Sequence, residues 1–175
     1  MHIQIMELKP ELIEKYQVKD FLFTMIKSSY GLDYVPEFHY DVMNLEKYYL
    51  NPERSNFFIA VDNDKDLLVG TSAIRGYDKD YHIENKNYTL EKTASIYRMF
   101  VEEDYRRCKI ASKLLKNIES FCREKDYTEI YLHTQKNSTG ALPFWLKNNY
   151  QITKDMHNEW HTVHMEKILT SLAKK

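Results

Sequence analysis

The spacing of apolar residues changes along this chain, and that change limits the folds it can adopt. Within residues 10–31, apolar residues such as Leu12, Tyr16 and Met25 recur near helical spacing. From Ser55 onwards, short apolar runs alternate with polar turns, which is typical of strands. The combination predicts a mixed α/β or α+β fold.

The expected order is strand, two helices, three strands, helix, strand, helix and two strands. No repeat or Pro/Gly-rich linker marks a boundary, so we expect one domain over residues 1–175. The sheet should be mixed, with about seven strands, and flanked by helices. The expected elements cover residues 2–8, 10–31, 35–51, 55–78 (a hairpin), 90–101, 106–125, 128–135, 138–149 and 151–169 (a second hairpin).

Composition excludes several classes of protein. A net charge of −1 argues against general nucleic-acid binding, which needs a strong basic excess. No segment approaches the ~20 apolar residues of a membrane span, and residues 1–10 lack the apolar run of a signal peptide. Cys108 and Cys122 would lie roughly 21 Å apart on one helix, too far for a disulfide. We therefore expect a cytoplasmic protein with reduced thiols.

Three histidines near the C-terminus, His157, His161 and His164, raise the question of a metal site. The surrounding sequence predicts two strands joined by a polar turn near residues 155–158. Positions three apart on a strand face opposite sides, so His161 and His164 should not converge on one ion. We expect no metal site there.

Basic residues gather where a strand leads into a helix, in the stretch FVEEDYRRCKIASKLL (residues 100–115). Arg106, Arg107 and Lys109 are three of its four residues at positions 106–109. The helix dipole disfavours cations at this end, and unpaired N–H groups there suit a phosphate. An anionic ligand explains the pattern better than a solvated helix end does.

Together with its neighbours, this stretch resembles the GNAT acetyltransferase superfamily. Residues 106–111 occupy a segment that has the form Arg/Gln-x-x-Gly-x-Gly/Ala in that family. The strand YRMFV before it, and YLHTQKNSTGALPFWLKNNY after it, match the family's neighbouring elements. The resemblance covers about residues 94–150 and implies a GNAT-like domain.

The resemblance implies that the chain binds acetyl-CoA. The pyrophosphate would lie on backbone amides of the turn and helix start, and the pantetheine would pair with the preceding strand. One backbone N–H of that strand would polarise the thioester carbonyl. The cofactor residues implied are Met99, Phe100, Val101, Arg106, Arg107, Cys108, Lys109, Ile110, Ala111, Ser112, either Asn137 or Ser138 or both, and Trp145.

Three positions depart from the family's usual residues. Lys109 stands where the family prefers glycine, which permits unusual dihedral angles and a close approach to phosphate. Trp145 replaces the tyrosine that often protonates the leaving thiolate, and Ser95 lies where some members carry a glutamate base.

His133 is the candidate catalytic base, since it lies twelve residues before Trp145, where some members of the superfamily carry a glutamate base. A histidine could deprotonate an ammonium directly or through water. Equally, His133 could pack in the sheet with one nitrogen hydrogen-bonded. Glu102 and Glu103 are alternatives that read more simply as solvated turn residues.

The acceptor is expected to contact the first helices, where YGLDYVPEFHYD (residues 30–41) mixes carboxylates and aromatics. Carboxylates within aromatic walls could hold a cationic amine. The same pattern also fits an amphipathic helix with ordinary core aromatics. The candidate residues are Asp33, Tyr34, Glu37 and, further along the chain, Tyr77.

The sequence thus predicts an acetyl-CoA-dependent N-acetyltransferase that acts on a primary amine by direct attack in a ternary complex. Cys108, beside the expected pyrophosphate, is badly placed to carry an acetyl group. The alternative is a non-catalytic acyl-CoA-binding regulatory module. A homodimer through the C-terminal hairpin is conceivable.

Overall fold

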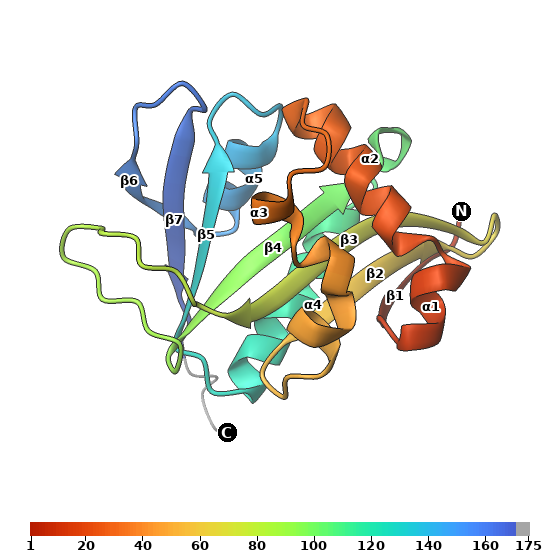
Figure 1. The fold of residues 1–175 in the computed structure, drawn as a ribbon, viewed down its shortest axis with the longest axis horizontal. Helices are drawn as coiled ribbons and strands as arrows, with labels where there is room; N and C mark the ends of the chain where they lie inside the picture. Colours follow the sequence, from red (N-terminus) through yellow and green to blue (C-terminus); the bar gives the residue numbers. More distant parts are fainter. Residues whose placement is uncertain (171–175) are drawn as a thin grey trace. The chain divides into compact units, whose positions relative to one another are not determined.

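The computed structural model describes residues 1–170, and its elements follow the expected order (Figure 1). The strands are β1 (Ile3–Glu7), β2 (Asn56–Asp62), β3 (Leu67–Gly76), β4 (Thr93–Val101), β5 (Glu129–Gln135), β6 (Gln151–Asp155) and β7 (Thr162–Ile168). The α-helices are α1 (Pro10–Lys15), α2 (Val18–Tyr30), α3 (Pro36–His39), α4 (Ile110–Glu124) and α5 (Ala141–Lys147). Short helical turns are η1 (Val42–Asn44), η2 (Glu46–Leu50) and η3 (Glu103–Tyr105).

The strands form one seven-stranded sheet in the order β1-β2-β3-β4-β5-β7-β6. β4 and β5 are parallel, whereas β1/β2, β2/β3, β5/β7 and β6/β7 are antiparallel. The predicted mixed sheet of about seven strands with flanking helices is therefore confirmed.

The chain divides into two compact units. The first comprises Met1–Arg75 and Tyr97–Ser120, and the second comprises Gly76–Ile96 and the described residues from Phe121 onward. β4 and α4 each contribute residues to both units.

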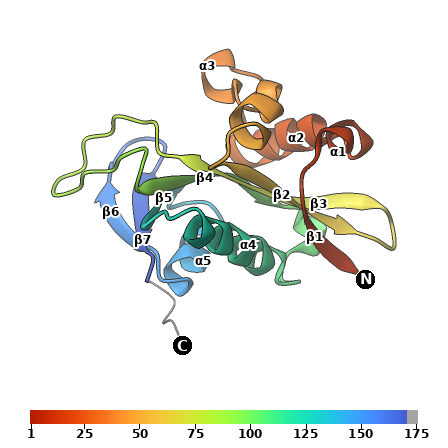
Figure 2. The same ribbon diagram turned by 90° about the horizontal axis from the view of Figure 1, so that it is seen from below.

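In the first unit, α1 and α2 cover one face of β1–β3 and the beginning of α4 covers the other (Figure 2). The alternation along β2 explains this arrangement, because Phe57, Ile59 and Val61 point into the core that α2 shares. Helix α2 contributes Leu22 and Ile26, which are almost completely buried.

The single helix expected over residues 10–31 is wrong in one respect, because it breaks in two. Gln17 adopts a left-handed conformation with φ 48°, which ends α1 and lets α2 start in a new direction. Val18, the first residue of α2, is fully buried after this turn. The predicted stop at Gly31 is confirmed: its φ is 69° and its N–H donates to the carbonyl of Lys27.

The second predicted helix, over residues 35–51, is also irregular. It consists of α3 followed by η1 and η2 rather than one continuous α-helix. The irregular path buries His39, Val42, Leu45 and Tyr49 together, which a regular helix of this length would spread around its circumference.

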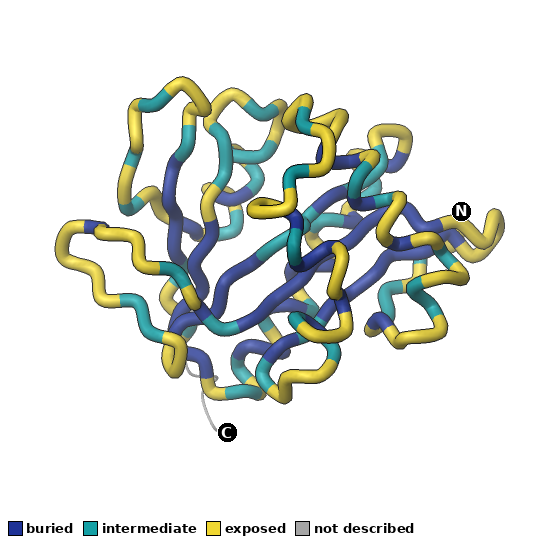
Figure 3. The backbone as a smooth tube through the Cα atoms, in the orientation of Figure 1, coloured by how far each residue is buried: buried dark blue, intermediate teal, exposed yellow. Residues whose placement is uncertain are grey.

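In the second unit, α5 lies on one face of β5 and β7, and the segment between β3 and β4 lies on the other (Figure 2). We call this segment, residues 77–92, the β3–β4 arm. Most of the arm is exposed (Figure 3), but Tyr77 and Ile83 pack with Tyr131 of β5 in a small buried cluster. Among the described residues, no helix is both long and apolar enough to span a membrane.

Candidate functional site

Strand β4 contains a left-handed residue, Arg98, with φ 53°. A non-glycine residue of this kind inside a strand marks a bulge. The carbonyl of Arg98 accepts a hydrogen bond from Thr71 Oγ1 at 2.7 Å. Pairing of β4 with β5 is limited to Thr93–Ser95, although β4 continues to Val101. Of the predicted pantetheine residues that follow the bulge, Phe100 is buried and Met99 and Val101 are half-buried.

The turn after β4 is fixed to the first unit by two hydrogen bonds. The N–H of Glu102 donates to the carbonyl of Val69 at 2.8 Å, and Tyr105 Oη donates to Asp62 Oδ2 at 2.7 Å. The second bond lowers the pKa of Asp62 and raises the pKa of Tyr105 to about 12. The turn is thus anchored before the basic residues begin.

The basic residues lie in the turn rather than in the helix. Helix α4 begins at Ile110, so the predicted start at Arg106 is wrong by about one turn. Arg107 and Lys109 have φ of 69° and 62°, conformations in which a Cβ atom is strained. Lys109 therefore adopts the dihedral angle that favours glycine.

The first turn of α4 is open on its outer side. The side chains of Arg106, Arg107, Lys109 and Ser112 are exposed, and those of Cys108 and Ala111 are half-buried. Ile110 is 1% exposed, so its side chain belongs to the core and only its backbone can reach a ligand. The first N–H groups of a helix have no partner within the helix, so this end presents donors and positive charge together.

Gly70 of β3 brings α4 close to the sheet, and the sequence analysis missed it. A Cβ atom on Gly70 would lie 3.1 Å from Ile110 Cγ2 and 3.2 Å from the carbonyl oxygen of Phe100. A larger residue would push the start of α4 away from β4. No local pattern identifies such a residue, since the contact depends on an element that follows much later.

The candidates that follow β4 in the second unit lie on β5, the next turn and α5. His133 is exposed on β5, Asn137 is exposed and Ser138 is half-buried, with its hydroxyl near Gln135 Oε1 at 3.5 Å. Trp145 is 5% exposed and packs edge-to-face against Tyr150, with ring centroids 5.0 Å apart. Trp145 therefore contributes to the core of this unit.

The candidate acceptor residues of the first unit lie in and around α3. Asp33 is exposed and pairs with Lys27 at 3.1 Å, and Glu37 is exposed. Tyr34 packs edge-to-face on Phe23, with centroids 5.6 Å apart. Tyr77, by contrast, is buried in the second unit.

A buried ion pair, which sequence analysis did not find, occupies the same region of the first unit. Arg98 donates from Nη2 to Asp41 Oδ1 at 2.7 Å and from Nε to Oδ2 at 3.0 Å. Tyr49 Oη donates to Asp41 Oδ2 at 2.6 Å. Burial alone would raise the pKa of Asp41, but the hydrogen bonds and charge of Arg98 outweigh it and lower that pKa. Asp41 is therefore already neutralised by a guanidinium.

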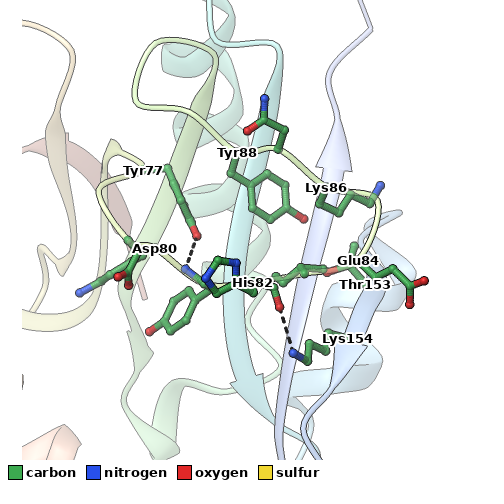
Figure 4. Close-up of a pocket in the computed structure, with 12 residues that line it drawn as sticks. Tyr77, Asp80, His82, Glu84, Lys86, Tyr88, Thr153 and Lys154 are labelled. Carbon is green, nitrogen blue, oxygen red and sulfur yellow. Dashed lines mark hydrogen bonds between the residues drawn. The ribbon is translucent and has the colours of Figure 1, made fainter.

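The second unit contains a pocket of ≈ 730 Å³ between the β3–β4 arm and β6 (Figure 4). Tyr77 and Tyr88 line one side, and Lys154 of β6 lines the other. Lys154 Nζ donates to the carbonyl of His82 at 2.9 Å, and the N–H of Tyr81 donates to Tyr77 Oη at 3.2 Å. These bonds fold the arm over β6.

The C-terminal histidines lie as the hairpin predicts. β6 and β7 pair, and the turn between them holds His157 and His161, both exposed, whereas His164 is buried in β7. Within residues 1–170, no three potential metal ligands come together.

The fold is that of known acetyltransferases. A GNAT-family acetyltransferase from Staphylococcus aureus Mu50 aligns with a TM-score of 0.74 and 23% identity, covering 97% of this chain and 100% of that one. PaiA N-acetyltransferase from Thermoplasma acidophilum, solved with coenzyme A, aligns with a TM-score of 0.69 and 19% identity, covering 97% and 100%. The sheet and helix arrangement defines the class as a GNAT-type acyltransferase fold.

Sequence comparison agrees with this class. The model of the acetyltransferase (GNAT) family matches residues 20–150, and the chain belongs to that family. Human N-acetyltransferase 8 is 26% identical over 132 residues, which are 71% of this chain and 54% of that protein. Mouse N-acetyltransferase 8 is 28% identical over 115 residues, 66% of this chain and 47% of that protein. The chain spans about half the length of these curated relatives.

Proposed function

We propose that this chain is an acetyl-CoA-dependent N-acetyltransferase that acts on a primary amine by direct attack in a ternary complex. The observation that carries the proposal is the turn before α4, where Arg107 and Lys109 are both left-handed and expose the helix start. Family membership and relatives named N-acetyltransferase support the same activity.

The residues around this turn fit a CoA pyrophosphate. Backbone amides of residues 107–112 would hold the phosphates, with Arg106, Arg107 and Lys109 supplying positive charge. The pantetheine would run along Met99–Val101, beyond the end of the β4–β5 pairing. Bound acetyl-CoA supplies the activated acetyl group as a thioester.

His133 is the proposed base. It would accept the proton of the acceptor's ammonium group, so that the neutral amine can attack the thioester carbonyl. One backbone N–H of β4 would stabilise the negative charge that develops on the carbonyl oxygen. Nothing in this scheme requires an acetylated cysteine.

For the acceptor, we propose contacts with Asp33, Tyr34, Glu37 and Tyr77. Asp33 and Glu37 are exposed, so their carboxylates are available to a cationic amine. Asp41 is left out of this set because Arg98 neutralises it. Asp33 pairs with Lys27 at the surface, where such pairs are weak and easily exchanged.

Acetyl-CoA binding tests the proposal through two matched variants of α4. Ser112→Asp places a carboxylate on the first turn, where it would repel a pyrophosphate, and Ser120→Asp places one later on the same helix. Both serines are exposed. We expect Ser112→Asp to weaken acetyl-CoA binding about tenfold in calorimetry, equivalent to ~1.4 kcal/mol. Ser120→Asp should bind like wild type.

Helix stability does not confuse this comparison, because an acidic residue in the first turn is favourable for a helix. Equal affinities in the two variants would contradict a pyrophosphate at this end. If wild type shows no thermal shift with acetyl-CoA, free CoA or ADP, acetyl-CoA binding itself is wrong.

Three further points belong to this proposal. We propose that both units act as one acetyltransferase domain in the cytoplasm, and the thiols Cys108 and Cys122 suit a reducing compartment. A homodimer could form through the C-terminal hairpin, where Met156 and Trp160 are 40% and 51% exposed. Light scattering of wild type and Trp160→Ser tests the dimer, which the variant should weaken.

A further inference from the structure

A buried tyrosine and a buried histidine share a short hydrogen bond in the second unit. Tyr131 Oη of β5 lies 2.6 Å from His164 Nδ1 of β7, and the two residues are 2% and 4% exposed. A hydroxyl and an imidazole lose water when they are buried, so each needs a partner of this kind. Neither residue is part of the function proposed above.

His133, the proposed base, stands directly opposite this pair. His133 and His164 are register partners in the antiparallel β5/β7 ladder, so their side chains share one face of the sheet. Their ring centroids are 6.3 Å apart. Tyr131 lies on the same face, two residues before His133.

Tyr81 of the β3–β4 arm covers the three rings. Its centroid lies 4.9 Å from that of His164, 6.1 Å from Tyr131 and 6.4 Å from His133. Tyr81 therefore shields the hydrogen-bonded pair, whereas His133 stays exposed.

The charged groups around His164 disfavour a second positive charge. Lys154 of β6 is its register partner on the other side, and together with burial, the larger effect, it lowers the pKa of His164. Glu166, two residues along β7, is held by Lys86 Nζ and Tyr88 Oη at 2.7 Å each. The nearest carboxylate along β7 is thus already occupied by its own partners.

We propose that Tyr131 and His164 are positioning residues for His133. Tyr131 donates its hydroxyl hydrogen to Nδ1 and holds His164 as a neutral imidazole, so that His133 alone takes up the proton released by the acceptor amine. This inference rests on the proposed function for the role of His133. The pairing itself stands on the geometry of β5, β7 and the arm.

The physical reason is like-charge repulsion. If His164 could also be protonated, two imidazolium groups would face each other across neighbouring strands, and His133 would hold its proton less tightly. Tyr131 prevents this by occupying the nitrogen that would otherwise accept a proton. His133 then titrates as a single group in the range useful to a general base.

Proton titrations of the histidine ring C–H signals by NMR test the pair without any substrate. The two signals are assigned with His133→Gln and His164→Gln. In Tyr131→Phe, we expect the pKa of His164 to rise by about half a unit or more, since a single hydrogen bond is lost. The pKa of His133 should fall by at least about 0.3 unit, through repulsion.

Two variants control for general disturbance of the aromatic cluster. Tyr88→Phe removes a hydroxyl that bonds Glu166 instead of His164, and it should leave both histidines unchanged. In the double variant Tyr131→Phe/His164→Gln, His133 should titrate as in wild type, because no second imidazole is left. Unchanged histidines in Tyr131→Phe, or equal shifts in Tyr88→Phe, would overturn the inference.

The catalytic part has its own measurement, the pH profile of kcat/KM for acetyl transfer to an accepted amine. We expect Tyr131→Phe to move the acid limb to lower pH by the shift seen for His133, and His133→Gln to remove that limb. A limb unmoved by either variant overturns the positioning role. Absence of acetyl-CoA binding instead overturns the proposed function, and the NMR result distinguishes the two failures.

Discussion

The two units hold their buried polar groups in different ways. In the first unit, Asp41 and Arg98 form a charged pair with two hydrogen bonds, and Tyr49 adds a third. In the second, Tyr131 and His164 form a neutral pair with one bond. A charged pair is costly to break and insensitive to mild acid. A neutral pair that contains histidine is cheaper to break but titrates close to neutral pH.

Removing the carboxylate should have the largest effect on this comparison. Asp41→Asn leaves Arg98, whose side chain is 15% exposed, without its counter-charge. We expect the free energy of unfolding to fall by about 3 kcal/mol in urea denaturation. Asp33→Asn, at an exposed pair, should cost less than about 0.5 kcal/mol. Similar losses in both variants would mean that burial of the pair contributes little.

Deleting one tyrosine hydroxyl from each cluster sharpens the comparison. Tyr49→Phe removes a hydrogen bond to an ionised carboxylate, for which we expect a loss of about 1.5–3 kcal/mol. Tyr131→Phe removes a bond between neutral groups and should cost about 1 kcal/mol. Both rings stay in place, so packing is matched. The reverse order of losses would contradict a neutral His164.

Acid should separate the two clusters. The pKa of His164 is lower in the folded protein, mainly because of burial, so the unfolded chain binds more protons as pH falls through about 6.5. The free energy of unfolding should therefore decrease from that pH downwards. The pKa of Asp41 is also lowered, so its contribution is present above the usual carboxyl range and is lost only in stronger acid, below about pH 4.

Urea midpoints measured at several pH values check this order. His164→Gln should flatten part of the decrease near pH 6. His39 will retain its own share, since burial and Arg98 also lower the pKa of His39. An unchanged slope in His164→Gln would show that His164 is not buried as a neutral imidazole.

The smallest effect concerns the backbone of the first unit. Lys109→Gly removes a side chain from a left-handed position and should raise the free energy of unfolding by roughly 0.5–1 kcal/mol. Lys113→Gly, an exposed position inside α4, should lower it by about 1 kcal/mol. Acetyl-CoA affinity of Lys109→Gly should be equal or better if backbone amides hold the pyrophosphate. A large loss would assign that task to the lysine ammonium.

Much of the fold could be predicted because it depends on local patterns. The alternation in β2 and β3, the apolar face of α4 and the stop at Gly31 each involve residues close together in sequence. The break at Gln17 was missed, since nothing in its side chain requires a left-handed conformation. For the candidate site, the position of Lys109 was recognised through the family resemblance, and its dihedral angle agrees with the glycine preference.

The sequence by itself determined the order of elements, the mixed sheet and the basic turn that leads into α4. Only the tertiary structure revealed the bond between Arg98 and Asp41, 57 residues apart, and the bond between Tyr131 and His164, 33 residues apart. Periodicity reports which face a side chain takes, because that depends on its near neighbours. It cannot report which partner lies across that face, because the partner is fixed by strand register and by loops that return from elsewhere in the chain.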